Sequence, residues 1–275
     1  MLPSIIGIGA QRSGTTWIYE MLKAHPEVDI SPEKEVNFFN YHYHNGIGWY
    51  EKFFSGCDKN KKTGEYSPTY LSYDQVPERI YRTVPDARLI ISLRNPVDQI
   101  YSRYLYRVNR QRYDRSFEDA LKEDSSLIED AFYYKHIKKF LERFDRGQIL
   151  ILIYDDLIDD ASAFLQSIYR FLNIDINFVP ANLYTKIHVS RIPKSRSAEY
   201  FMLSVRGIFR QFRLFSVVEK LKEKGIDRWF KKLNTKDDIV LQKIDSDLRS
   251  DLNNTFFEDI QKISSLLGRD LSFWK

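Results

Sequence analysis

Three short stretches of the chain are almost entirely apolar. They cover residues 5–8, 88–93 and 149–153, and isoleucine and leucine predominate in each. A strand that lacks alternation of apolar and polar residues is buried on both faces, which is typical of a parallel sheet. Segments with apolar residues at helical spacing separate the three stretches. The pattern therefore predicts an α/β fold, in which helices on both faces flank a parallel sheet.

A helix is expected after each of these core strands. The first should span residues 15–23. Asn95 can cap the second, with Pro96 in its first turn, and this helix should run to about residue 110. The third is an amphipathic helix over 156–172. Further helices are predicted over 49–54, 73–83, 131–144 and 256–267 and after the cap residue Ser116, with a short strand at 28–30 and a strand end and turn at 62–68.

The chain contains no internal repeat, low-complexity tract or flexible linker. We therefore expect one domain over residues 1–275, with a mostly helical C-terminal portion from about residue 197. Residues 201–224 are basic and amphipathic. This segment is either a helical cap with a solvated basic face or a face that contacts a membrane surface or a polyanion.

The composition is that of an ordinary soluble globular protein, with 43% hydrophobic and 29% charged residues. No apolar run is long enough to span a membrane, and the first strand begins so close to Met1 that no signal peptide is expected. The single cysteine, Cys57, excludes an internal disulfide and favours a reducing, cytoplasmic location. A net charge of +4 suits anionic ligands without indicating nucleic acid. Five scattered histidines and one cysteine give no spacing typical of a metal site.

A glycine-bounded loop joins the first strand to the first helix. Four residues separate Gly9 from Gly14, which is the spacing of the phosphate-binding P-loop. Such a loop directs backbone N–H groups and a helix N-terminus at an anion. Thr15 occupies the position of the P-loop lysine, and the basic residue lies inside the loop, at Arg12. The loop is therefore poorly suited to ATP hydrolysis and suited to another anionic ligand, although a plain turn would show the same pattern.

A second candidate site begins where the second core strand ends, at Arg94. The carboxyl ends of parallel strands are where α/β sheets bind ligands. Ser102 lies about two turns into the following helix. A guanidinium and a hydroxyl placed in this way can converge on a phosphate, with the guanidinium binding bidentately. The alternative is that Arg94 only ends a strand and Ser102 is a neutral helical residue.

Residues 11–17, which read Gln-Arg-Ser-Gly-Thr-Thr-Trp, resemble the 5′-phosphosulfate loop of sulfotransferases that use 3′-phosphoadenosine-5′-phosphosulfate (PAPS). Residues 88–102 are similar to the 3′-phosphate motif of the same family. The resemblance implies a P-loop-containing nucleotide-binding fold, PAPS as the cofactor, adenosine 3′,5′-bisphosphate as the product and no metal. It also implies a set of cofactor-binding residues, namely Gln11, Arg12, Ser13, Gly14, Thr15, Thr16, Trp17, Arg94 and Ser102.

Two further stretches are similar to the family. Residues 131–157 match a helix and a strand that are mostly architectural, and Asp155 and Asp156 are expected to cap the next helix. Many members carry a basic loop that folds over the nucleotide. The resemblance places this loop at Lys194, Ser195 and Arg196, although a solvated basic loop is the alternative.

The closest resemblance is to heparan-type carbohydrate sulfotransferases and their bacterial relatives. Their sequence Glu-Val-His-Phe-Phe is matched by residues 35–39, with Asn37 in the histidine position. The glutamate is the catalytic base in those enzymes. The resemblance therefore implies that Glu35 removes the acceptor's proton, with Lys34 and Arg12 supplying positive charge. A surface glutamate in a charged loop is the alternative, and His42 and His44 are rival bases or acceptor contacts.

A sequence of the heparan type, Glu-Lys-Thr-Pro-Ala-Tyr, corresponds to residues 65–70, so Tyr66 replaces a lysine near the acceptor. The expected acceptor contacts are Asn37, His42, His44 and Tyr66. The function implied is in-line transfer of a sulfuryl group from PAPS to a hydroxyl of a carbohydrate, a glycolipid or a small alcohol. The alternatives are a P-loop kinase-like phosphotransferase and a non-catalytic protein that binds a nucleotide or a polyanion.

Overall fold

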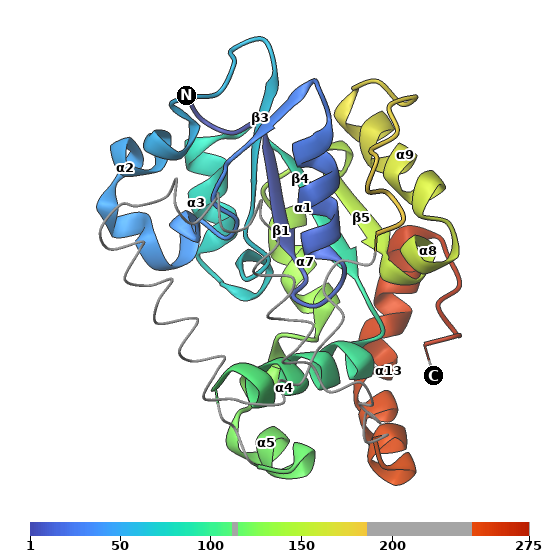
Figure 1. Ribbon diagram of the computed structural model, residues 1–275. Helices are drawn as coiled ribbons and strands as arrows, with labels where there is room; N and C mark the ends of the chain where they lie inside the picture. The colour runs from blue at the N-terminus through green and yellow to red at the C-terminus, as the bar shows by residue number, and fades with distance from the viewer. Residues whose placement is uncertain (112–114, 186–243, 275) are drawn as a thin grey trace, which may run out of the picture. The chain divides into compact units, whose positions relative to one another are not determined.

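The computed structural model describes residues 1–111, 115–185 and 244–274 (Figure 1). The chain divides into two compact units, one of residues 1–104, 115–187 and 244–275 and the other of residues 105–114 and 188–243. The first unit holds the sheet. Lys194, Ser195, Arg196 and the segment 201–224 lie outside the described residues, and the single domain over 1–275 stays a prediction.

The centre of the first unit is a sheet of five parallel strands in the order β2-β3-β1-β4-β5. Every position of β1 is buried, as the unbroken apolar run predicts. The predicted α/β fold class is therefore confirmed, and β1 lies at the middle of the sheet. The strands are β1 (Ile5–Gly9), β2 (Val28–Ile30), β3 (Lys62–Tyr66), β4 (Arg88–Leu93) and β5 (Ile149–Ile153).

Helices cover both faces of this sheet (Figure 1). The longer ones are α1 (Thr15–Ala24), α3 (Val76–Thr83), α4 (Pro96–Gln111), α5 (Phe117–Glu123), α7 (Tyr133–Leu141), α9 (Ala161–Leu172) and α13 (Ser246–Leu267). The shorter ones are η1 (Phe38–His42), η2 (Tyr43–Asn45), α2 (Ile47–Glu51), η3 (Lys52–Phe54), η4 (Tyr70–Ser72), α6 (Ser126–Glu129), η5 (Arg146–Gln148) and α8 (Tyr154–Asp159).

The core has two layers because successive side chains of a strand point to opposite faces. Ile6 and Ile8 of β1 belong to one buried cluster, together with residues of η1, α2, α3, α7 and α13. Ile5 belongs to the other cluster, together with residues of α1, α8 and α9. The absence of a side chain at Gly7 lets the Tyr66 ring of β3 lie against β1, since a Cβ there would come within 2.2 Å of the ring.

The predicted single helix over 156–172 is wrong, because the structure has two helices there, α8 and α9. Asp160 between them is extended, with φ −146°, and its carboxylate accepts hydrogen bonds from the N–H groups of Ser162 and Ala163. An aspartate that binds backbone N–H groups in this way ends one helix and caps the next. The apolar spacing continues through the break, which is why the pattern did not predict it.

The predicted capping role of Asp155 and Asp156 is also wrong. Asp155 accepts a hydrogen bond of 3.0 Å from the Trp274 indole, and Asp156 forms an ion pair with Arg269. Both contacts tie α8 to the end of the chain. By contrast, Ser116 caps α5 as predicted, because its hydroxyl accepts a hydrogen bond from the Asp119 N–H.

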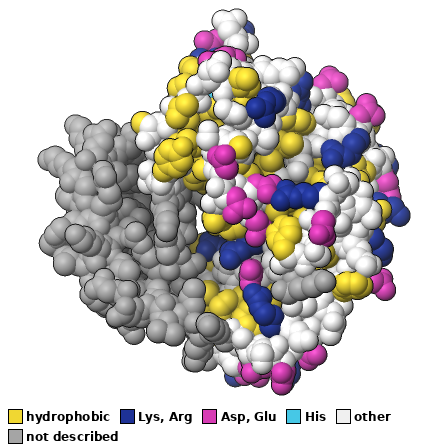
Figure 2. Space-filling model, turned by 90° about the vertical axis from the view of Figure 1, so that its right-hand side faces the viewer, with side chains coloured by type: hydrophobic (Ala, Val, Ile, Leu, Met, Phe, Trp, Pro, Cys, Tyr) yellow, Lys and Arg dark blue, Asp and Glu magenta, His cyan; other side chains and the backbone are white. Residues whose placement is uncertain are grey.

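One described face of the molecule is mixed in charge (Figure 2). Figure 2 shows one face of the molecule, on which acidic and basic side chains lie interspersed. This agrees with the small net charge of +4. Within residues 1–111, 115–185 and 244–274, no helix combines the length and apolarity that a membrane span requires.

Candidate functional site

The loop between β1 and α1 has the backbone geometry of an anion cradle. Gly14 precedes the helix with φ 80°, and Arg12 has φ 65°, so both residues are left-handed. A loop with alternating backbone conformations turns successive N–H groups toward one point. Gly14 is required here for a second reason, because a Cβ would come within 3.0 Å of the Tyr154 ring. Gly14 has no side chain that could cap α1, so first-turn N–H groups of the helix are suited to a ligand.

Ser13 in the same loop is fully buried. Its hydroxyl has no hydrogen-bond partner among the residues that the structure describes. Buried hydroxyls in native proteins almost always have a partner, and leaving one unsatisfied costs about 1–3 kcal/mol. The loop therefore contains a polar atom for which a ligand would supply the missing partner.

The structure brings together two residues that the sequence assigns to different phosphate sites. The Nε atom of Arg12 donates a hydrogen bond of 3.1 Å to the Ser102 hydroxyl, which lies on α4. Both side chains are partly exposed. Arg94, at the end of β4, lies with its guanidinium carbon 5.2 Å from the centre of the Tyr154 ring. Tyr154 thus lies against both Arg94 and the Gly14 turn.

Tyr154 was not among the predicted site residues. It directly follows β5 and lies within the family-like stretch 131–157, for which the sequence predicted only an architectural role. Cation–π attraction holds the Arg94 guanidinium over the face of the Tyr154 ring. This contact uses no N–H group, so the N–H groups of the guanidinium can still donate hydrogen bonds to a ligand. We conclude that the ends of β1, β4 and β5 converge on the glycine loop.

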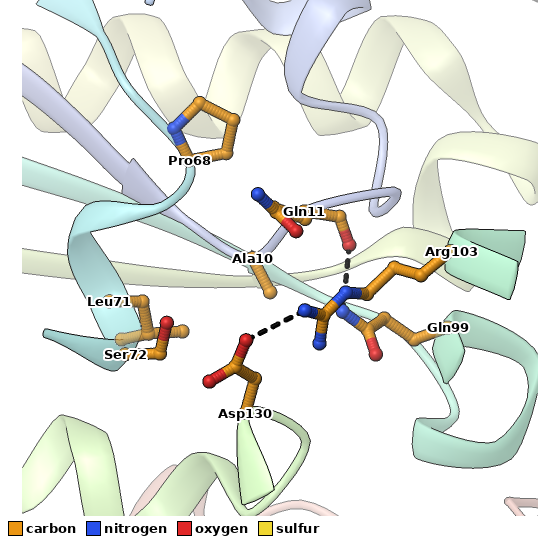
Figure 3. Close-up of a pocket in the computed structure, with 8 residues that line it drawn as sticks. All are labelled: Ala10, Gln11, Pro68, Leu71, Ser72, Gln99, Arg103 and Asp130. Atoms are coloured by element: carbon orange, nitrogen blue, oxygen red, sulfur yellow. Dashed lines mark hydrogen bonds and ion pairs between the residues drawn. The ribbon is translucent and has the colours of Figure 1, made fainter. Parts of the chain in front are cut away.

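A small pocket is lined by residues of the loop after β1, of η4 and the residue Pro68 before it, of α4 and of the segment before α7 (Figure 3). The Gln99 side chain donates a hydrogen bond of 3.1 Å to the Gln11 carbonyl and so fixes the loop to α4. Arg103, one turn further on, forms an ion pair of 2.7 Å with Asp130. Gln99, Arg103 and Asp130 were not predicted from the sequence, although Gln99 and Arg103 share a helix face with Ser102. The full lining is Ala10, Gln11, Pro68, Leu71, Ser72, Gln99, Arg103 and Asp130.

Three other predicted cofactor residues lie at the start of α1. Thr15 is buried and Thr16 is partly exposed. Trp17 is buried, and its indole N–H donates a hydrogen bond of 3.1 Å to the Leu183 carbonyl while its ring packs edge-on against Phe164. The Trp17 side chain is therefore part of the core between α1 and α9.

Glu35 lies in a turn that runs along the end of β3. Its N–H donates a hydrogen bond of 3.0 Å to the Tyr66 carbonyl, and its carboxylate forms an ion pair of 2.6 Å with Lys34. The Glu35 side chain is 47% exposed. Because β3 and β1 are adjacent parallel strands, this turn and the glycine loop lie at the same edge of the sheet. The structure therefore places Glu35 and Lys34 on the side where the loop lies.

Asn37 holds the same turn from inside. Its side-chain N–H donates a hydrogen bond of 2.9 Å to the Glu35 carbonyl, and its side-chain oxygen accepts one of 2.8 Å from Thr69. Glu35 has φ 65° and Asn37 has φ 53°. Two left-handed residues that are not glycine require such supporting contacts.

Glu65, near the end of β3, is a buried carboxylate that was predicted only as part of the heparan-type motif. It is fully buried and accepts hydrogen bonds from the hydroxyls of Tyr50, Tyr70 and Ser67 at 2.7, 2.8 and 2.7 Å. Burial raises the pKa of the Glu65 carboxyl, while the three hydroxyl groups act in the opposite direction. The strand β3 reads Lys-Thr-Gly-Glu-Tyr, so Glu65 does not stand out there as an isolated polar residue.

Tyr66 differs from its prediction as an acceptor contact. Its ring is fully buried over Gly7, and its hydroxyl donates a hydrogen bond of 3.3 Å to the Gly9 carbonyl. The buried side chain offers no surface to an acceptor, which argues against the predicted contact. The lysine position of the heparan-type motif is thus occupied by a core residue.

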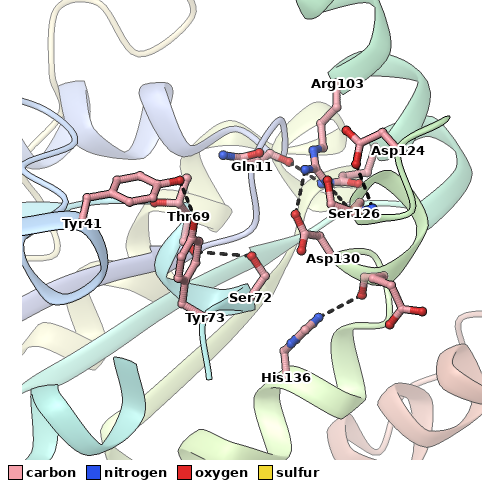
Figure 4. A network of polar contacts seen from close by, with 12 residues as sticks. Gln11, Tyr41, Thr69, Ser72, Tyr73, Arg103, Asp124, Ser126, Asp130 and His136 are labelled. Carbon is pink, nitrogen blue, oxygen red and sulfur yellow. Dashed lines mark hydrogen bonds and ion pairs between the residues drawn. The ribbon is translucent and has the colours of Figure 1, made fainter. Parts of the chain in front are cut away.

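The other predicted acceptor contacts are at the surface. His42 is partly exposed and lies 5.2 Å from the Trp49 ring, and His44 is exposed. Nearby, the Tyr73 hydroxyl donates a hydrogen bond of 2.6 Å to the Tyr41 hydroxyl. In Figure 4, Gln11 lies between this tyrosine pair and Arg103. Among the described residues, no group of His, Cys, Asp or Glu side chains is suited to a metal ion.

Comparison with known proteins identifies relatives of this chain. A family model described as the sulfotransferase domain matches residues 2–208. The membrane-associated sulfotransferase kil1 of Dictyostelium discoideum is 34% identical over 137 residues, which cover 46% of this chain and 29% of that protein. Heparan sulfate glucosamine 3-O-sulfotransferase 5 of Homo sapiens is 31% identical over 199 residues, covering 66% of this chain and 57% of that protein. The chain thus spans less than two thirds of the length of these relatives.

Solved structures share the fold. A sulfotransferase from Alicyclobacillus acidocaldarius superposes with a TM-score of 0.72, covering 100% of this chain and 99% of that chain at 22% sequence identity. The sulfotransferase domain from the curacin biosynthetic pathway gives a TM-score of 0.50 at 14% identity, covering 68% of this chain and 79% of that chain. These similarities confirm the predicted P-loop-containing nucleotide-binding fold.

Proposed function

The chain belongs to the PAPS-dependent sulfotransferase family, and from this we propose that it transfers a sulfuryl group from PAPS to a hydroxyl of a carbohydrate, a glycolipid or a small alcohol. The contact between Arg12 and Ser102 carries the proposal. It joins the loop that resembles the phosphosulfate-binding segment to the helix that resembles the 3′-phosphate segment. One ligand with a phosphate at each end would engage both.

The residues of the loop fit a bound phosphosulfate. The buried Ser13 hydroxyl needs a partner, and the left-handed residues Arg12 and Gly14 turn backbone N–H groups toward one point. We propose that Gln11, Ser13, Thr15, Thr16 and the backbone at Trp17 bind the 5′ end. Arg94 and Ser102 would bind the 3′-phosphate, and Lys194, Ser195 and Arg196, which lie outside the described residues, would add positive charge.

For the chemical step we propose that Glu35 is the general base and that Lys34 orients it. The acceptor oxygen forms a bond to sulfur, the bond from sulfur to the phosphate oxygen breaks, and Glu35 takes the hydroxyl proton. The leaving phosphate keeps the electron pair, and Arg12 stabilises its charge. The partly exposed Glu35 carboxylate, at the sheet edge that carries the loop, supports this assignment.

The acceptor is proposed to be a carbohydrate first of all. Two relatives are named for heparan sulfate glucosamine, which is an amino sugar of a glycan. Asn37, His42 and His44 would contact it. A cytoplasmic location rests on the single half-buried Cys57, and one relative is named as membrane-associated, so the location is a separate proposal.

The test is transfer of radioactive sulfate from labelled PAPS to a panel of oligosaccharides, glycolipids and small alcohols. We expect label in at least one glycan and none when labelled ATP replaces PAPS. Transfer of phosphate from ATP would favour the kinase-like alternative, to which the threonine at position 15 is poorly suited. Binding of adenosine 3′,5′-bisphosphate without any transfer would favour a non-catalytic binding protein.

A further inference from the structure

The buried carboxylate of Glu65 is the centre of a hydroxyl network behind the Glu35 turn. Tyr50 and Tyr70 both donate to Oε1, and Ser67 donates to Oε2. All four side chains are fully buried. A carboxylate in such a place requires this many donors, because burying a charge without partners is strongly unfavourable. The cost of keeping Glu65 there suggests that it has a role beyond packing.

Two arms lead from this carboxylate to the backbone of the segment that carries Glu35. In the first, the Asn37 N–H donates to the Ser67 hydroxyl at 3.0 Å, and that hydroxyl donates to Glu65 at 2.7 Å. In the second, the Phe39 N–H donates to the Tyr70 hydroxyl at 3.3 Å, and that hydroxyl donates to Glu65 at 2.8 Å. A hydroxyl has one proton, so each oxygen that gives its proton to Glu65 is free to accept from an amide.

Both amides lie where the chain needs external acceptors. Asn37 immediately precedes η1 and Phe39 is in its first turn, so their N–H groups have no acceptor in a preceding turn. Asn37 also has a left-handed backbone, and its side-chain N–H donates a hydrogen bond of 2.9 Å to the Glu35 carbonyl. Fixing the Asn37 backbone therefore fixes the Glu35 turn.

We propose that Glu65 is a positioning residue, which acts through Ser67 and Tyr70 to hold the turn that presents Glu35 to the acceptor. The catalytic half of this inference rests on the proposed function. The structural half, the hold on the Asn37 and Phe39 amides, does not. Glu65 itself is buried and does not touch the reacting atoms.

Tyr50 provides a matched control for Tyr70. Both tyrosines are fully buried and both donate to the same oxygen of Glu65, but only Tyr70 also accepts a hydrogen bond from a backbone amide. Replacing either one by phenylalanine removes the same hydroxyl group and leaves the ring. Loss of packing or of solvation of Glu65 should therefore be the same in the two variants, whereas loss of positioning should occur only in Tyr70→Phe.

The kinetic test compares Tyr70→Phe, Ser67→Ala and Tyr50→Phe. We expect the first two to lower kcat about ten- to a hundredfold, as for a misplaced catalytic group, with the acceptor KM and the affinity for adenosine 3′,5′-bisphosphate little changed. Tyr50→Phe should keep kcat near the wild-type value. Equal losses of kcat in Tyr50→Phe and Tyr70→Phe would overturn the proposal, because they would indicate a general effect on the buried charge.

Amide hydrogen exchange tests the structural half without any acceptor. Ser67→Ala should speed exchange at Asn37 more than at Phe39, and Tyr70→Phe should do the reverse. Unchanged exchange at both amides would overturn the inference even in an active enzyme. If the wild-type protein transferred sulfate to no acceptor, the proposed function would fail, and the exchange pattern would still decide whether Glu65 holds this turn.

Discussion

Arg12, in the loop after β1, donates a hydrogen bond of 3.1 Å to Ser102, in the second turn of α4. The two residues are 90 positions apart in the sequence. Their contact exists because β1 and β4 are adjacent parallel strands, so that the segments after both strands begin at the same edge of the sheet. A ligand that occupies the loop after β1 therefore lies beside the helix after β4 as well.

The first prediction concerns a ligand with two phosphates. Adenosine 3′,5′-bisphosphate should raise the melting temperature more than 5′-AMP does at equal concentration. A ligand that binds only the native state stabilises it by mass action, by about 2.7 kcal/mol at a hundredfold excess over Kd. Thermal-shift measurements with both nucleotides check this. Equal shifts would mean that no second phosphate site exists.

The second prediction concerns Arg94. Arg94→Ala should weaken binding of adenosine 3′,5′-bisphosphate by about 1.5–3 kcal/mol, the contribution of a hydrogen bond to a charged group, and leave 5′-AMP binding nearly unchanged. Isothermal titration calorimetry measures both affinities. The affinity of Arg94→Lys for adenosine 3′,5′-bisphosphate should lie between those of the wild type and Arg94→Ala, since lysine keeps the charge and lacks the planar guanidinium.

Arg82 is the control for Arg94. It lies on α3 with its side chain 73% exposed and pairs with Glu78. Arg82→Ala removes one positive charge from the protein but no predicted phosphate contact, so both nucleotides should bind it as they bind the wild type. If Arg94→Ala weakened the two nucleotides equally, Arg94 would have a structural role, through its stacking on Tyr154.

The third prediction concerns pH and Glu65. Burial raises its pKa above the ordinary value of 4.5, so the native state holds the proton more tightly than the unfolded state does. The free energy of unfolding should therefore fall as pH rises from about 4.5 through the raised pKa, because the native state must give up a proton that it binds more tightly. Urea titrations across this range should show a steeper decline for the wild type than for Glu65→Gln.

Glu78→Gln is the control of opposite sign. The side chains of Arg143 and Arg82 lower the pKa of Glu78, so its contribution to stability is present above the ordinary pKa and is lost as pH falls. Removing this carboxylate should therefore flatten the acid side of the stability curve and leave the decline toward neutral pH in place. A wild-type curve unchanged by Glu65→Gln would contradict the assignment of that decline to Glu65.

Much of the fold could be predicted because a strand that is buried on both faces has an almost entirely apolar sequence. β1 and β5 are unbroken apolar runs, β4 is apolar except for Arg88 and Ser92, and all three lie where the sequence placed them. The break between α8 and α9 could not be predicted from the apolar pattern, since the helical spacing of apolar residues continues through it. The break depends on the Asp160 carboxylate, which accepts hydrogen bonds from two backbone N–H groups. The spacing of apolar residues does not reveal these contacts.

The site residues likewise include some that the sequence could predict and some that it could not. The glycine loop and the Glu35 segment follow from the order of neighbouring residues, so a local sequence motif reveals them. Gln99 and Glu65 have their roles through partners far along the chain: Gln99 bonds to Gln11, which is 88 positions away, and Glu65 accepts from Tyr50, which is 15 positions away. A single sequence does not show which of its polar residues will meet, so these contacts required the structure.

The last prediction concerns the catalytic base. Glu35→Gln keeps the shape of the side chain and removes its ability to take a proton. It should lower kcat roughly a hundredfold or more, the contribution of a positioned base. The affinity for adenosine 3′,5′-bisphosphate should stay within about twofold, because Glu35 binds no phosphate in the proposed mechanism. Steady-state kinetics with a saturating acceptor and calorimetry with the bisphosphate separate the two effects.

His42→Ala and His44→Ala decide between the rival bases. His42 ends η1 and is partly exposed, and His44 lies in η2 and is exposed, so an acceptor contact there would raise the acceptor KM and leave kcat nearly intact. If Glu35→Gln kept near-normal turnover and one histidine variant lost it, the base would be that histidine. The family assignment would stand in that case, because it rests on the match over residues 2–208 and not on the identity of the base. The Glu65 network would then hold a turn that serves the acceptor instead of the proton transfer.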